Sequence, residues 1–218
     1  MYTIDLSNVA RYDTQNARSF VEFWGQFYVE DDIKVLDAEE LIDYFTELNI
    51  ANDLTEENLR RLLRWKDPRL LTHRILSGTN KGQDNARVRK VLANLGPINQ
   101  FRNEQITAAE IRGTIDQVFA DGVVWKAFLQ HIAQPHVYPI ADQNVFRVWS
   151  LHTGRKDEQT WATYDSYCDY FGQIAQAIGA DRTIENIRQL KRIDDALLCF
   201  GLFLAAYWKP EKKSGPVP

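Results

Sequence analysis

The sequence predicts an all-α protein, arranged as a two-lobed helical bundle. Apolar residues recur at the spacing of one helix face from about Thr14 onward. Residues that favour helix N-termini precede several of these apolar stripes. No stretch shows the alternation of β-branched and aromatic residues that is typical of a strand. Apolar residues make up 44% of the 218 residues, so the chain can build a sizeable core.

Three amphipathic helices are predicted in the first 66 residues. Their apolar stripes are Phe20, Trp24 and Phe27, then Leu41, Phe45 and Leu48, and then Leu59, Leu62 and Leu63. Asp37 and Thr55 stand where the second and third helices are expected to begin. The dipeptide Asp67-Pro68 is expected to end the third helix, because proline does not continue one.

The remaining helices follow the same pattern. One apolar stripe predicts a helix that Gly96-Pro97 closes, and another helix is expected from about Thr107. Two long helices are expected at about 160–178 and 183–207, and the second is apolar on all sides from Ala196 onward. That helix is therefore expected at the centre of the bundle. We interpret residues 1–208 as a single helical domain and 209–218 as a disordered tail.

Composition indicates a cytoplasmic protein without a membrane anchor. The two cysteines, Cys168 and Cys199, are too few for a disulfide framework or a four-cysteine metal site. The N-terminal residues lack the basic and apolar regions of a signal peptide. The longest uncharged apolar stretch has 13 residues, whereas a membrane span needs about 20.

Charge is distributed unevenly along the chain. The formal net charge is −4, but residues 1–59 carry fourteen acids and three bases, whereas residues 60–90 carry ten bases and two acids. Such a basic segment can neutralise a phosphate backbone while the whole chain stays acidic. The alternative is that these bases form solvated helix faces that meet the acidic N-terminal part.

The stretch from Thr107 to Gly154 carries the functional signal. One helix is expected to end at Phe119-Ala120, and after a tight turn at Asp121-Gly122 a second helix begins and stops at Pro135. An extended run then leads to Asp142, which is expected to open a third helix that ends at Gly154. Two helices joined by a short glycine-containing turn form a hairpin, and this arrangement resembles the helix-hairpin-helix motif. The amides at the start of its second helix can bind a phosphate.

This order of parts resembles the helix-hairpin-helix DNA glycosylase superfamily, and in particular its small all-helical members, which are similar to 8-oxoguanine glycosylases. In that superfamily the hairpin reads Gly-Val-Gly-x-Lys, and a proline-containing link leads to an aspartate at the head of the next helix. The matching residues are Gly122-Val123-Val124-Trp125-Lys126 and the run from Tyr138-Pro139 to Asp142. Val124 stands where the superfamily has its second glycine.

The resemblance implies that Lys126 is a nucleophilic amine and that Asp142 is the catalytic carboxylate. An amine can displace the base at the sugar C1′ and form a Schiff base. A carboxylate can take a proton and stabilise the positive charge that develops on the sugar. The expected contacts to double-stranded DNA are Gly122, Val123, Val124 and Trp125 of the turn, together with the basic residues Arg87 and Lys90.

These observations leave three hypotheses. The first is a DNA glycosylase, with or without AP-lyase activity, that extrudes a damaged or modified base into a cleft between two helical lobes. The second is a non-catalytic helix-hairpin-helix protein that binds DNA, which Val124 and the acidic balance favour. The third is a helical protein-interaction module whose acidic N-terminal helices form the contact surface. No cofactor is expected, and no metal site, because the four histidines lack suitable partners at ligand spacing.

Overall fold

The structure is a computed structural model, and it describes residues 16–28, 42–67, 78–79, 81–120 and 122–207. The described residues form ten α-helices and no strand, which confirms the all-α prediction. The chain divides into two compact units, which we describe separately. Unit 1 comprises Met1–Tyr28 and Pro139–Pro218, and unit 2 comprises Val29–Tyr138. The expected tail at 209–218 and the expected N-cap Asp37 lie outside the described residues, and the single domain over 1–208 stays a prediction.

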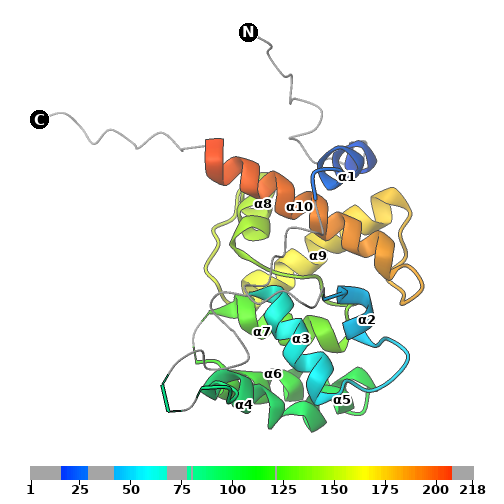
Figure 1. The fold of residues 1–218 in the computed structure, drawn as a ribbon. Helices are drawn as coiled ribbons and strands as arrows, with labels where there is room; N and C mark the ends of the chain where they lie inside the picture. Colours follow the sequence, from blue (N-terminus) through cyan, green and yellow to red (C-terminus); the bar gives the residue numbers. More distant parts are fainter. Residues whose placement is uncertain (1–15, 29–41, 68–77, 80, 121, 208–218) are drawn as a thin grey trace, which may run out of the picture. The chain divides into compact units, whose positions relative to one another are not determined.

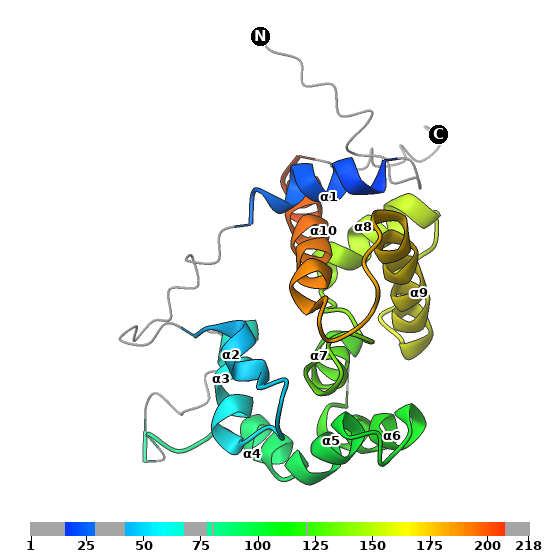
Figure 2. The same cartoon turned by 90° about the vertical axis from the view of Figure 1, so that its right-hand side faces the viewer.

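Unit 1 is built around its last helix. Its helices are α1 (Ala17–Gly25), α8 (Gln143–Thr153), α9 (Trp161–Ile178) and α10 (Ile187–Tyr207). Helix α10 packs against α1, α8 and α9, as Figure 1 and Figure 2 show. Burial is greatest along its middle turns, where Ala196, Leu197 and Phe200 are almost fully enclosed. Its last turns are less enclosed, and Leu202 and Tyr207 are 51% and 77% exposed.

Unit 2 is a set of shorter helices. They are α2 (Tyr44–Leu48), α3 (Glu56–Lys66), α4 (Ala86–Leu92), α5 (Leu95–Arg102), α6 (Ala108–Val118) and α7 (Val123–Ala133). Helix α7 packs against α5 and α6, while α3 packs against α2 and α4. In the described part of the chain, none of the helices has the length and apolar character needed to cross a bilayer.

Local sequence signals explain where most of these helices begin. Thr55 and Thr107 each form a capping box, in which the hydroxyl and the residue three positions later exchange hydrogen bonds with the backbone. Asp142 caps α8 and Gly154 ends it in the left-handed conformation at φ 71°. These three N-caps and this C-terminus agree with the helix boundaries that the sequence predicts.

One helix boundary was predicted wrongly. Gly96-Pro97 was expected to close a helix that includes Leu95, but α4 ends at Leu92 and a further helix, α5, begins at Leu95. Pro97 lies in the first turn of α5, where its missing N–H removes no helical hydrogen bond. The dipeptide therefore starts a helix instead of ending one, and the sequence analysis missed α5.

Arg102, at the end of α5, connects this helix to α2 and α7. Its guanidinium donates to the carbonyl oxygens of Ile132 at 3.0 Å, Leu48 at 2.7 Å and Asn49 at 2.6 Å. Burial lowers the pKa of Arg102, yet these carbonyls satisfy its donors. The end of α7 and the turn after α2 are thereby held to the same side chain.

Candidate functional site

The turn between α6 and α7 has a backbone conformation that depends on glycine. Helix α6 ends at Val118 with Phe119 as its C-cap, and Gly122 is the N-cap of α7 at φ 70°. Residues that have a side chain rarely adopt this left-handed backbone conformation. Gly122 is exposed and, as a glycine, has no side chain to cap the first-turn amides of α7; among the described residues, no side-chain cap is seen for this helix. These amides are therefore donors available to an anion. Asp121 lies outside the described residues.

The side chains that follow Gly122 turn toward the hydrophobic interior of unit 2. Val123 is buried, and Val124 and Trp125 are half-buried. The Trp125 ring stacks on Phe119 with ring centroids 6.1 Å apart. The side chain of Val123, one of the predicted DNA contacts, therefore packs within unit 2.

The ammonium of Lys126 is bound by groups of α6 and of the turn that follows α6. Its ammonium lies 2.8 Å from a carboxylate oxygen of Asp116 on α6, and it also donates to the carbonyl of Ala120 at 3.5 Å. The side chain of Lys126 is 14% exposed and that of Asp116 is 44% exposed. The sequence analysis assigned Lys126 but missed Asp116, whose spacing from Lys126 gives no helix-periodic signal.

Asp142 has a half-buried carboxylate at the head of α8. Its Oδ1 accepts hydrogen bonds from the amides of Asn144 at 2.6 Å and Val145 at 2.9 Å. Among the described residues, no group donates a hydrogen bond to the other oxygen, Oδ2. One oxygen is therefore fixed by the helix, while the second keeps its acceptor capacity with respect to the described residues.

The link that leads into Asp142 is bound by side chains of α9 and α10. Tyr164 donates to the carbonyl of Pro139 at 2.8 Å, and Tyr167 donates to that of Ile140 at 3.2 Å. The amide of Ile140 donates to Asp194 Oδ2 at 3.5 Å. Burial raises the pKa of both tyrosines well above the usual value, so their hydroxyls remain protonated donors.

None of the three side chains that bind the link, Tyr164, Tyr167 and Asp194, was predicted as a site residue from the sequence. Asp194 and Asp195 stand between Ile193 and the apolar run that begins at Ala196, and both are buried. Acids at such positions are rare unless they have partners. Two adjacent acids beside an apolar run are therefore a sequence signal for polar side chains with partners in the core.

Part of the basic segment is neutralised by neighbouring acids. Arg61 pairs with Glu47 at 3.0 Å and with Glu57 at 3.1 Å. Arg60 pairs with Glu56 at 2.9 Å, and the hydrogen bonds to Asp84 raise its pKa. Arg61 and Glu47 show that bases of this segment do meet the acidic N-terminal part.

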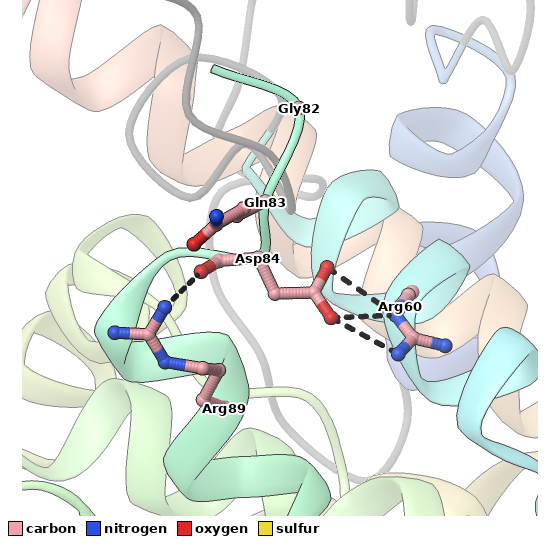
Figure 3. A pocket seen from close by; sticks show the side chains of 5 residues that line it. All are labelled: Arg60, Gly82, Gln83, Asp84 and Arg89. Atoms are coloured by element: carbon pink, nitrogen blue, oxygen red, sulfur yellow. Dashed lines mark hydrogen bonds and ion pairs between the residues drawn. The ribbon is translucent and has the colours of Figure 1, made fainter. Parts of the chain in front are cut away.

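A shallow cavity lies beside one of these ion pairs. It has a volume of about 410 Å³ and is lined by Arg60, Gly82, Gln83, Asp84 and Arg89, as Figure 3 shows. The Asp84 carboxylate accepts from Arg60 at 3.0 Å, while the Asp84 carbonyl accepts from Arg89 at 2.9 Å. Because Asp84 engages both guanidinium groups, this cavity is a weaker anion site than its arginines alone would predict.

Arg87 and Lys90 project from α4 and are exposed. They lie in unit 2 with the Gly122–Lys126 turn, whereas Asp142 belongs to unit 1. Among the described residues, no three His, Cys, Asp or Glu side chains gather closely enough to hold a metal ion.

Comparisons of the chain with models of protein families, with curated proteins and with solved structures found no match. The function must therefore be argued from the residues and their geometry.

Proposed function

We propose that the chain is a helix-hairpin-helix DNA glycosylase in which Asp142 is the reacting carboxylate. The observation that carries the proposal is the geometry of Asp142, whose Oδ1 is fixed by two amides of α8 while Oδ2 accepts no hydrogen bond from the described residues. A fixed carboxylate needs little reorganisation before it stabilises positive charge on a sugar. Oδ2 of Asp142 can also accept a proton from an attacking nucleophile.

The α6–α7 hairpin supplies the proposed grip on the DNA backbone. Gly122 gives the turn its left-handed conformation, and within the described residues its position provides no side-chain cap for the first-turn amides of α7. A phosphate can accept from these amides, and the helix dipole adds to the attraction. Exposed Arg87 and Lys90 on α4 contribute charge that is independent of base sequence.

Lys126 is the proposed nucleophile of a bifunctional reaction. Its amine would attack C1′, the N-glycosidic bond would break, and the released base would take a proton. The C1′–O4′ bond would then break, and O4′ would take the second amine proton as the C1′=N bond forms. The resulting Schiff base is the species that borohydride reduces to a stable adduct. For this reaction the amine must leave its ion pair with Asp116 and lose a proton.

The decisive experiment is a panel of duplexes that carry different base lesions, assayed for base release by wild type and Asp142→Asn. Asparagine caps a helix about as well as aspartate, so this variant is expected to keep its thermal stability. Removal of the carboxylate charge is expected to lower the base-release rate by at least about 100-fold. No release by wild type on any lesion, or equal rates for both proteins, would contradict the proposal.

Borohydride trapping on the same panel resolves the role of Lys126. A covalent adduct that forms with wild type and disappears in Lys126→Ala identifies the nucleophile. Asp116→Asn is the matched control, because it removes the ion pair and keeps the amine. Base release without an adduct in any variant would assign the chemistry to Asp142 and water.

The second candidate function is a DNA-binding protein without base-release activity. The ion pair of Lys126 with Asp116 favours it, since the amine is engaged within the hairpin. Duplex binding that weakens steeply with salt, without base release on any lesion, would select this function.

A further inference from the structure

The extended link before α8 has little regular hydrogen bonding of its own. Pro139 has no N–H to donate, and neither Ile140 nor Ala141 lies within a helix. Buried backbone groups of such a link require partners from elsewhere in the fold. Ile140 and Ala141 are both buried, so the supporting side chains determine where the link runs.

Three side chains of unit 1 provide that support. Tyr164 and Tyr167, one helical turn apart on α9, bind the carbonyls of Pro139 and Ile140. Asp194 on α10 binds a backbone N–H of the link. Its Oδ2 accepts a hydrogen bond from the Ile140 amide at 3.5 Å. Its second oxygen, Oδ1, lies 3.5 Å from the Tyr167 hydroxyl. The one proton of the Tyr167 hydroxyl is shared between Asp194 Oδ1 and the Ile140 carbonyl. Asp194 is therefore bound directly to the amide of Ile140 and indirectly, through Tyr167, to its carbonyl.

We propose that Asp194 is a positioning residue that sets the place of the Asp142 carboxylate through Ile140 and Tyr167. The inference rests on the proposed function, because the reaction assigned to Asp142 is base release. Ile140 precedes Asp142 by only two residues, so a shift of the link moves the head of α8. Asp194 is only 6% exposed, which suits a supporting role and not direct contact with a nucleotide.

Two substitutions separate the hydrogen bonds of Asp194 from its shape. Asp194→Asn keeps an oxygen for the Ile140 amide and offers an N–H to the Tyr167 hydroxyl. Asp194→Leu has a similar shape but no polar atom. We expect Asp194→Leu to lower kcat for base release about 10- to 100-fold, because small displacements of catalytic groups have effects of this size. Asp194→Asn is expected to stay within about threefold of wild type, and neither variant is expected to change KM for the duplex.

A second readout needs no catalysis. Hydrogen exchange of the Asn144 and Val145 amides reports whether Asp142 Oδ1 still caps α8. These amides are expected to exchange about ten times faster in Asp194→Leu than in Asp194→Asn. Ile178→Ala, at the far end of α9, is the stability control, because it removes buried carbons without touching the link. If Asp194→Leu does not fold, Tyr167→Phe tests the same connection and keeps the ring packing.

The outcomes distinguish this inference from the proposed function. Faster exchange in Asp194→Leu, with wild type inactive on every lesion, supports the positioning role and contradicts the glycosylase. Wild-type exchange in Asp194→Leu overturns the positioning role whatever the activity. Equal losses of kcat in Asp194→Leu, Asp194→Asn and Ile178→Ala also overturn it, since the loss would then follow general stability.

Discussion

At the scale of single residues, the carboxylates of the chain differ in what they bind. Asp142 uses one oxygen as a helix cap, Asp116 is paired with Lys126, and Asp194 binds a backbone amide in the core. A carboxylate that accepts hydrogen bonds is stabilised in its charged form. Glu110, in the capping box of α6, shows this effect clearly enough to be tested.

The capping box of α6 is expected to weaken in acid. The hydrogen bond from the backbone amide of Thr107, followed by that from its hydroxyl, lowers the pKa of the Glu110 carboxyl below its usual 4.5. The stabilisation is therefore present above that value and is lost as the pH falls through the lowered pKa of the folded state. Titration of the Glu110 side chain by NMR should give a midpoint below that of the unfolded chain in urea.

Thr107→Val provides the control for this titration. It removes the hydroxyl but keeps the backbone amide, so the Glu110 midpoint is expected to move only part of the way toward the unfolded value. A wild-type midpoint equal to that of the unfolded chain would show that the capping box does not form.

At the scale of elements, close packing of α10 on α8 holds the helix that Asp142 heads. A Cβ added at Gly201 would lie 2.4 Å from the Asn144 carbonyl oxygen. Arg147 of α8 donates to the Gly201 carbonyl at 3.1 Å and to the Asn144 side chain at 2.7 Å. Gly201 is therefore required by the approach of two backbones and not by its own helix.

Gly201→Ala is expected to destabilise the protein by about 1–3 kcal/mol, because the first turn of α8 cannot yield as a flexible side chain would. Chemical denaturation measures the free energy of unfolding. Gly172→Ala, also within a helix of unit 1, is the matched control. Its added Cβ would meet the end of the Arg182 side chain at 3.2 Å.

The changes in the free energy of unfolding caused by Gly201→Ala and Gly172→Ala should differ in sign or in size. Arg182 can move, and alanine is the better helix former by about 1 kcal/mol. Gly172→Ala is therefore expected to remain within about 1 kcal/mol of wild type. Equal destabilisation by both substitutions would contradict the close-approach explanation for Gly201.

At the scale of the whole molecule, charge is segregated along the sequence and then partly neutralised by folding. The ion pairs of Arg60 with Asp84 and of Arg61 with Glu47 neutralise part of the charge of the basic segment. Arg87 and Lys90 stay exposed on α4. The proposed function therefore assigns part of the electrostatic contact to these two residues.

Arg87→Ala and Lys90→Ala are each expected to weaken duplex binding without regard to sequence. Each should reduce the slope of log K against log salt concentration by about 1, the value for one lost phosphate contact. Fluorescence anisotropy over a salt series measures this slope. Lys156→Ala, which removes an exposed base of unit 1, is the control and should leave the slope unchanged. A slope that none of these substitutions alters would contradict the assigned contact.

The sequence by itself determined the all-helical class and the boundaries that depend on near neighbours. Thr55, Thr107 and Asp142 were predicted as helix starts and cap their helices, and Gly154 ends α8 as expected. Capping joins groups two or three residues apart, so the local pattern contains both partners. The same reasoning failed at Gly96-Pro97, because a proline suits the first turn of a helix as well as the position after its end.

Only the tertiary structure decided which distant groups meet. Asp194 lies 54 residues from the Ile140 amide that it binds. Asn144 lies 57 positions before Gly201, where the absence of a side chain leaves room for the Asn144 backbone. The periodicity of a single helix does not relate such partners to one another. The packing of α8, α9 and α10 determines which of them meet. Burial then makes each partner necessary, because a polar group removed from water must find its hydrogen bond within the fold.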